Sequence, residues 1–123
     1  YVKLNQSLTT LSQGEAQRLK LARELLQTKG KHNLYLLDEP TVGLHMQDVE
    51  NFIKLLQELV EEGHSILVIE HNEQLLAACD YLIELGPQGG VHGGQLIAQG
   101  SPLALLHQNE SVIAPYLKRF IKD

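Results

Sequence analysis

Residues 34–40 read LYLLDEP, an uninterrupted apolar run that stops at two acidic residues and a proline. A second apolar run, ILVI at residues 66–69, leads into Glu70-His71-Asn72. Continuous runs of this kind are typical of strands that are buried on both faces of a parallel sheet. Between them, Gly63 ends a stretch of helical apolar spacing that comprises Val49, Phe52, Ile53, Leu56, Leu59 and Val60. Strand, helix and strand in this order predict a βαβ unit with a right-handed crossover.

The flanking segments extend this unit into an α/β fold. Upstream, residues 12–15 (SQGE) precede an amphipathic stretch that predicts a helix to about Thr28, followed by a turn at Gly30. Downstream, turn and cap signals predict four elements: a short helix capped by Asn72 that runs through Cys79, hairpin strands at 81–85 and 95–99 around a Gly-rich turn, a helix from Ser101-Pro102 to His107, and an amphipathic stretch at 112–121.

Composition narrows the class of protein. The 123 residues, 43% of them hydrophobic, suffice for one core but are few for a complete nucleotide-hydrolysing domain. The net charge of −5, without an isolated basic cluster, argues against a surface that binds the phosphate backbone of a nucleic acid.

No apolar run approaches the roughly 20 residues of a membrane span, and no secretory signal is visible, so a cytoplasmic location is expected. The single Cys79 cannot form an internal disulfide or zinc site alone, which favours a buried structural thiol.

Three side chains follow the two predicted parallel strands, at the edge where ligands bind in open α/β sheets. Asp38 and Glu39 end the first strand. In nucleotide hydrolysis, the first carboxylate of such a pair reaches the magnesium shell and the second polarises the attacking water. His71 ends the next strand, within reach of a γ-phosphate or that water. The alternatives are two solvated acids that cap a strand and a purely structural histidine.

Ser12 and Glu15 have the spacing of a capping box, which predicts that the upstream helix begins at Ser12. A helix start with Gly14 in its first turn would expose backbone N–H groups and the positive end of the helix dipole. The sequence therefore predicts an anion site there, suited to the phosphates of a nucleotide.

Together these motifs resemble the ABC ATPase family. LSQGE at residues 11–15 is similar to its signature sequence, residues 34–40 to its Walker B strand, and His71 to its switch histidine. Within the family the resemblance is to the UvrA-like excinuclease branch, through TTLSxGEAQR at 9–18, DEPTxGLH at 38–45, VIEHN at 68–72 and LGPxGG at 85–90. Transporter ATPases generally have an aspartate where this chain has His45.

The resemblance implies the C-terminal subdomain of an ABC nucleotide-binding domain over residues 1–123, in an ATP-driven DNA-damage sensor of nucleotide excision repair. ATP and magnesium are the implied cofactors. Asp38 would hold Mg²⁺ through water, Glu39 would be the catalytic base, and His71 would sense the γ-phosphate. Ser12, Gln13, Gly14 and Glu15 would close over ATP held by a second nucleotide-binding domain, in the same chain or a dimer mate. Damaged DNA and other excinuclease subunits would be partners of the parent protein, and no membrane would be.

Three departures from the family pattern bear on function. Gln13 stands where the signature usually has glycine. The chain contains no Gly-x-x-x-x-Gly-Lys-Ser/Thr phosphate loop, so alone it is expected to be inactive. It also contains no Cys-x-x-Cys motif, although zinc is implied for the parent. Two other functions remain open on these residues: the ATPase of a transporter or chromosome-maintenance protein, and a non-catalytic module that docks to partner ATPases.

Overall fold

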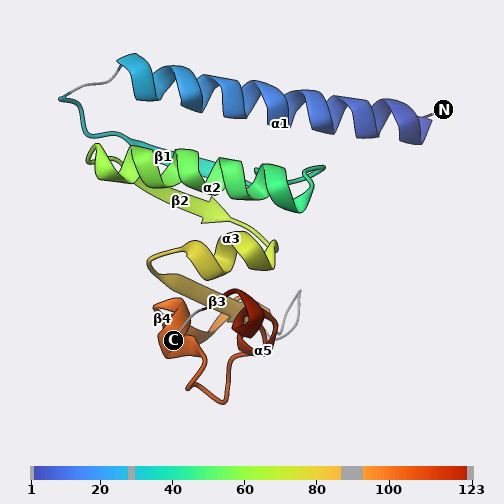
Figure 1. Cartoon of the computed structure of the whole chain (residues 1–123). Coiled ribbons are helices and arrows are strands. Elements are labelled where there is room, and N and C mark those ends of the chain that lie inside the picture. Colours follow the sequence, from blue (N-terminus) through green and yellow to red (C-terminus); the bar gives the residue numbers. More distant parts are fainter. Residues whose placement is uncertain (1, 28–29, 87–92, 122–123) are drawn as a thin grey trace. The chain divides into compact units, whose positions relative to one another are not determined.

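The computed structural model describes residues 2–27, 30–86 and 93–121, with side chains described from Glu15 onward. The chain forms two compact units that meet in sequence after His71 (Figure 1). Each unit contains one two-stranded sheet, parallel in the first unit and antiparallel in the second. The Gly-rich turn predicted after residue 86 lies largely outside the described residues.

The first unit contains the predicted βαβ arrangement. Helix α1 (Val2–Gln27) precedes strand β1 (Leu34–Asp38), helix α2 (Met46–Glu61) and strand β2 (Ser65–Ile69). The two strands are parallel, and their register pairs Leu34 with Ser65 and Asp38 with Ile69. Because the strands are in this register, both carboxyl ends lie at one edge of the sheet. The prediction of a parallel βαβ unit is confirmed.

Helix α2 presents one apolar face and ends at a glycine, as its sequence predicts. Val49, Phe52, Leu56 and Leu59 are buried on that face. At the end of the helix, Gly63 has φ +100, a left-handed conformation that glycine adopts without the Cβ penalty. The Gly63 N–H donates to the Val60 carbonyl at 2.9 Å and the N–H of the next residue donates to the Leu59 carbonyl at 3.1 Å. These two bonds form a Schellman cap.

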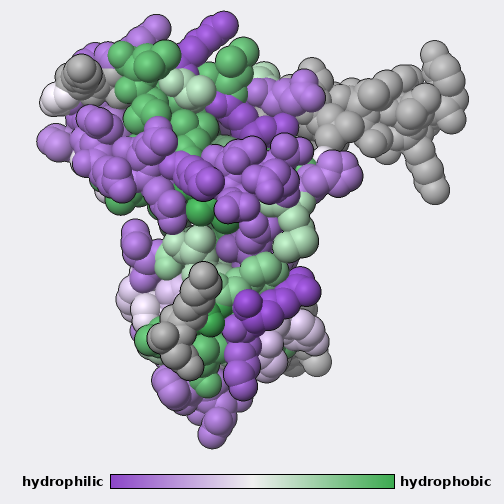
Figure 2. All heavy atoms as spheres, viewed as in Figure 1, coloured by the Kyte–Doolittle hydropathy of each residue, from purple (hydrophilic) through white to green (hydrophobic). Residues whose placement is uncertain are grey.

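Two expectations for the first unit are wrong. Helix α1 begins well before Ser12 and runs continuously through it, so Ser12 is not an N-cap and the predicted capping box does not start this helix. The strands are also not buried on both faces: Leu36 of β1 and Leu67 of β2 are 67% and 58% exposed. The alternate residues Tyr35, Leu37, Ile66 and Val68 are buried or partly buried, so only one face of this strand pair is covered. Figure 2 shows hydrophobic side chains at the surface of this unit among mostly hydrophilic ones.

The second unit joins short helices to an antiparallel strand pair. Its elements are α3 (Glu73–Ala78), β3 (Leu82–Gly86), β4 (Gln95–Gly100), α4 (Pro102–Leu105), α5 (Ala114–Leu117) and a 3-10 helix, η2 (Lys118–Phe120). Its core consists of five buried apolar residues, which are Leu82, Ala98, Leu105, Ala114 and Leu117. The antiparallel pairing of β3 with β4 confirms the predicted pairing of these strands.

Helix caps in the second unit also follow the sequence. The Asn72 side chain accepts a hydrogen bond from the Leu75 N–H, and the Ser101 hydroxyl accepts from the Ala104 N–H.

Cys79 is only partly buried, and its thiol donates to the Leu75 carbonyl at 3.3 Å. None of the helices within the described residues is both long and apolar enough to cross a membrane.

Candidate functional site

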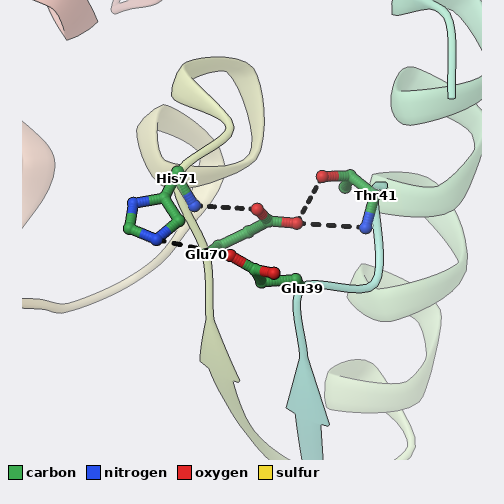
Figure 3. Close-up of polar contacts among 4 residues, drawn as sticks. All are labelled: Glu39, Thr41, Glu70 and His71. Carbon is green, nitrogen blue, oxygen red and sulfur yellow. Dashed lines mark hydrogen bonds and ion pairs between the residues drawn. The ribbon is translucent and has the colours of Figure 1, made fainter. Parts of the chain in front are cut away.

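The parallel register brings Glu39 and His71 together at the carboxyl ends of β1 and β2. Glu39 follows β1 directly and His71 lies two residues beyond β2. The His71 Nε2 atom lies 3.3 Å from the Glu39 Oε1 atom (Figure 3). Their side chains are 86% and 46% exposed, so both are open to a ligand in this structure. The pair places an acceptor carboxylate beside an imidazole, an arrangement that can bind and orient a water molecule.

Glu39 has an unusual backbone conformation for its residue type. Its φ is +46, the one positive value for a non-glycine residue among those that the structure describes. Its N–H donates to the Ile69 carbonyl at 2.8 Å, which extends the β1–β2 hydrogen bonding by one step. The left-handed conformation costs an L-residue about 1–2 kcal/mol. Such outliers persist where surrounding contacts hold them, and they cluster at functional sites.

Glu70 is a site residue whose role could not be predicted from the sequence motifs. Its Oε1 atom accepts hydrogen bonds from the Thr41 N–H, at 3.0 Å, and from the Thr41 hydroxyl. Its Oε2 atom accepts from the His71 N–H at 2.8 Å (Figure 3). One carboxylate therefore joins the loop after β1 to the segment after β2. The available signal was its position directly before His71 in the strand-end motif VIEHN.

Helix α1 also contacts the loop that follows Glu39. The guanidinium of Arg18 donates from Nη1 to the Pro40 carbonyl at 3.0 Å. Beyond it the loop turns through Gly43, which has φ +81, and the Leu44 N–H donates to the Thr41 carbonyl at 3.0 Å. Arg18 ends the signature-like segment TTLSQGEAQR, so this hydrogen bond links that segment to the Walker B-like segment. The sequence motif contained Arg18 but did not reveal this contact.

Asp38 ends β1 with an exposed side chain, and its surroundings suit a magnesium ion that other groups complete. A groove of about 850 Å³ between α1 and β1 has both Asp38 and Glu39 in its lining. Within the described part of the chain, no three His, Cys, Asp or Glu side chains converge to hold a metal by themselves. Mg²⁺ in nucleotide sites keeps several waters and takes one or two carboxylates plus phosphate oxygens. A single carboxylate beside open space fits that ligand set.

The signature-like residues lie away from the ends of their helix. Ser12, Gln13, Gly14 and Glu15 are all interior to α1. Interior residues of an α-helix use their N–H groups in bonds to carbonyls four residues back, so the free N–H groups expected for an anion site are engaged in this conformation. Of these four residues, only Glu15 has a described side chain, and it is exposed. Their binding roles stay predictions.

Comparisons with known proteins agree with this arrangement. Residues 1–42 match the family described as ABC transporter. The chain is 49% identical over 122 residues, 99% of its length, to UvrABC system protein A of Aquifex aeolicus (strain VF5), and 51% identical over 121 residues, 98% of its length, to that of Mycoplasmopsis pulmonis (strain UAB CTIP). The crystal structure of UvrA2 from Deinococcus radiodurans superposes with a TM-score of 0.80 at 44% identity, over 89% of the chain and 13% of that protein.

The chain belongs to the UvrA-like ABC ATPase family. Its α/β fold is that of the corresponding part of a UvrA structure, which confirms the predicted fold class. The chain spans about 13% of the length of both UvrA relatives. The family implies ATP and magnesium as cofactors, in agreement with the acidic end of β1.

Proposed function

We propose that this chain is part of an ATP-binding and ATP-hydrolysing DNA-damage-recognition subunit in nucleotide excision repair. Within it, residues 1–123 are the C-terminal subdomain of an ABC nucleotide-binding domain. The proposal is supported by identity of about one half, over nearly the whole chain, to proteins named UvrABC system protein A. The transporter alternative is disfavoured because the relatives that match nearly the whole chain are named UvrABC system protein A, whereas the ABC transporter family matches only residues 1–42.

The observation that carries the enzymatic part is the pairing of Glu39 with His71 at 3.3 Å beside Asp38. Bound Mg²⁺ would neutralise charge that develops on the phosphates during hydrolysis. Asp38 would hold the ion through water. Glu39 would orient the attacking water and accept its proton, and His71 would donate to the γ-phosphate. Each role needs a side chain at the carboxyl edge of the parallel sheet, where these three residues are found.

The remaining predicted residues act toward a partner. Ser12, Gln13, Gly14 and Glu15 close over ATP that is bound by a second nucleotide-binding domain, in the same chain or in a dimer mate. Because α1 is continuous through these residues, closure requires either a local break of the helix near Ser12 or contact through side chains. Damaged DNA and other excinuclease subunits bind elsewhere in the parent protein, zinc is held there too, and the assembly works in the cytoplasm.

Replacing Glu39 with Gln in the complete protein tests the enzymatic role. The amide keeps the size of the side chain but loses the base, so we expect kcat for ATP hydrolysis to fall by at least about 100-fold. Binding of ATP, measured by calorimetry with Mg²⁺, should stay within about threefold because Glu39 contacts the water rather than the nucleotide.

The matched control is Glu50→Gln. Glu50 is exposed on α2, where its contact is an i,i+4 pair with Lys54 at 3.9 Å. This variant has the same change of charge, but away from the strand ends, so we expect its kcat to equal that of the unmodified protein. Unchanged hydrolysis in Glu39→Gln would remove Glu39 from the chemistry and overturn the proposed mechanism.

A further inference from the structure

We infer that Glu70 is a positioning residue for hydrolysis: its carboxylate fixes the loop after β1 against the segment after β2 and thereby sets Glu39 beside His71. Neither Glu70 nor Thr41 has a role in the mechanism proposed above. The inference rests on that proposed function, because it assigns to these two residues the alignment of its catalytic pair.

The contacts of Glu70 divide between the two segments that carry the catalytic side chains. Oε1 faces Thr41, two residues after Glu39, and Oε2 faces the backbone N–H of His71. Thr41 is 6% exposed, so its N–H and hydroxyl have little access to water and need acceptors within the protein. Figure 3 shows the Glu70 side chain between the two segments, with Glu39 and His71 next to it.

A carboxylate suits this place because three donors converge on one side chain. An ionised carboxylate only accepts, on both oxygens, whereas an amide has one accepting oxygen and one donating nitrogen. In the Glu70→Gln variant, the amide NH₂ group would face either the Thr41 N–H or the His71 N–H. One of these donors would then lose its acceptor, and the charge that strengthens the remaining bonds would be gone.

Loss of the Glu70 hydrogen bonds would displace the catalytic pair, because Thr41 and Glu39 belong to one hydrogen-bonded turn. The Val42 N–H donates to the Glu39 carbonyl at 3.3 Å, so Thr41 lies within a turn that begins at Glu39. Glu39 itself is held at φ +46, a conformation that its own preference does not maintain. Misplacement of a reacting group by about 1 Å can cost roughly 100-fold in rate. Release of Thr41 would therefore act directly on the position of Glu39.

The experiment compares Glu70→Gln, Thr41→Val and the double variant in the complete protein, with Glu50→Gln as the charge-matched control. We expect Glu70→Gln to lower kcat about tenfold, with KM for ATP within about twofold, when kcat is normalised to active sites titrated by nucleotide binding. Thr41→Val removes one of the two Thr41 donors and should lower kcat about threefold. The double variant should be no slower than Glu70→Gln alone, because both changes act on the same contact.

Each outcome decides between the inference and its alternatives. A merely structural Glu70 would reduce the number of active sites but leave kcat per site unchanged, which would overturn the inference. Multiplicative losses of kcat in the double variant would also overturn it, since they would show that Glu70 and Thr41 act independently.

If Glu70→Gln does not fold, Thr41→Val decides alone, and an unchanged kcat in that variant counts against the inference. If Glu39→Gln in parallel is fully active, the proposed function itself fails; if it is inactive while Glu70→Gln is unaffected, only this inference fails.

Discussion

Glu39 and Glu84 are both glutamates associated with strands, one in each unit, and their surroundings differ in almost every respect. Glu39 follows β1 with its side chain 46% exposed, in a left-handed backbone conformation, with His71 at 3.3 Å. Glu84 lies within β3, where the register with β4 shifts between Glu84 and Leu85, and is 6% exposed. The first environment leaves a carboxylate available to a ligand at a cost in backbone energy. In the second environment, the carboxylate accepts hydrogen bonds from another segment of the chain and so stabilises the fold.

The partners of Glu84 explain why a charged residue is buried in the smaller unit. Its Oε1 atom accepts from the Ser111 hydroxyl at 2.5 Å, and its Oε2 atom accepts from the Val112 N–H at 2.8 Å and the Ile113 N–H at 3.3 Å. The Ser111 Oγ atom in turn accepts from the Ala114 N–H at 3.1 Å. One carboxylate thus satisfies the irregular segment that leads into α5. Buried charges are tolerated when they are hydrogen-bonded in this way.

The largest effect is therefore expected from Glu84→Ala. The change leaves a buried hydroxyl and two backbone N–H groups without an acceptor, at about 1–3 kcal/mol for each group that stays unsatisfied. We expect the free energy of unfolding of the second unit to fall by roughly 3 kcal/mol. Amide hydrogen exchange should show the loss first at Val112 and Ile113. Unchanged exchange at these amides would mean that the Glu84 carboxylate does not stabilise the segment that leads into α5.

Sequence patterns were sufficient for elements whose signal is local. The periodicity of α2, the parallel βαβ order and the caps at Asn72 and Ser101 were predicted because each depends on neighbouring residues. Glu84 gave no such signal: it reads as an ordinary polar residue in a strand, and its role depends on a segment 27 residues away. Its burial is a property of tertiary packing alone.

At the candidate site the same limit applies. The pairing of Glu39 with His71 could be predicted because parallel strands align their carboxyl ends. The bridge from Glu70 to Thr41 and the contact from Arg18 to Pro40 could not, because side-chain direction beyond a strand end has no periodicity to read. The capping box at Ser12 failed for the opposite reason: a local motif was overridden by a helix that continues through it.

A smaller effect, of opposite sign, is expected at Glu39. Glycine adopts φ +46 without the Cβ penalty, so Glu39→Gly should raise the free energy of unfolding of the first unit by about 1 kcal/mol while it abolishes hydrolysis. Glu39→Gln keeps the Cβ atom and should leave stability within about 0.5 kcal/mol of the original. Urea denaturation of the three proteins, monitored in the first unit by hydrogen exchange, separates backbone strain from charge. A destabilised Gly variant would show that the strain does not come from the backbone.

The smallest effect is expected from a third carboxylate, Glu73, which is exposed like Glu39 but belongs to the second unit. Its Oε2 atom lies 3.4 Å from Nη2 of Arg119, and the two side chains are 37% and 71% exposed. Exposed ion pairs contribute about 0–1 kcal/mol because water screens them and side-chain entropy opposes them.

Glu73→Gln should therefore lower the free energy of unfolding of the second unit by less than about 1 kcal/mol, and its effect should shrink further in high salt. The Arg119 guanidinium also lies over the Phe120 ring, 4.5 Å from its centroid, and that contact survives the substitution. Denaturation at low and high salt measures both effects. If Glu73→Gln lowered the free energy of unfolding as much as Glu84→Ala, side-chain exposure would not distinguish carboxylates that stabilise the fold from carboxylates that are available to a ligand.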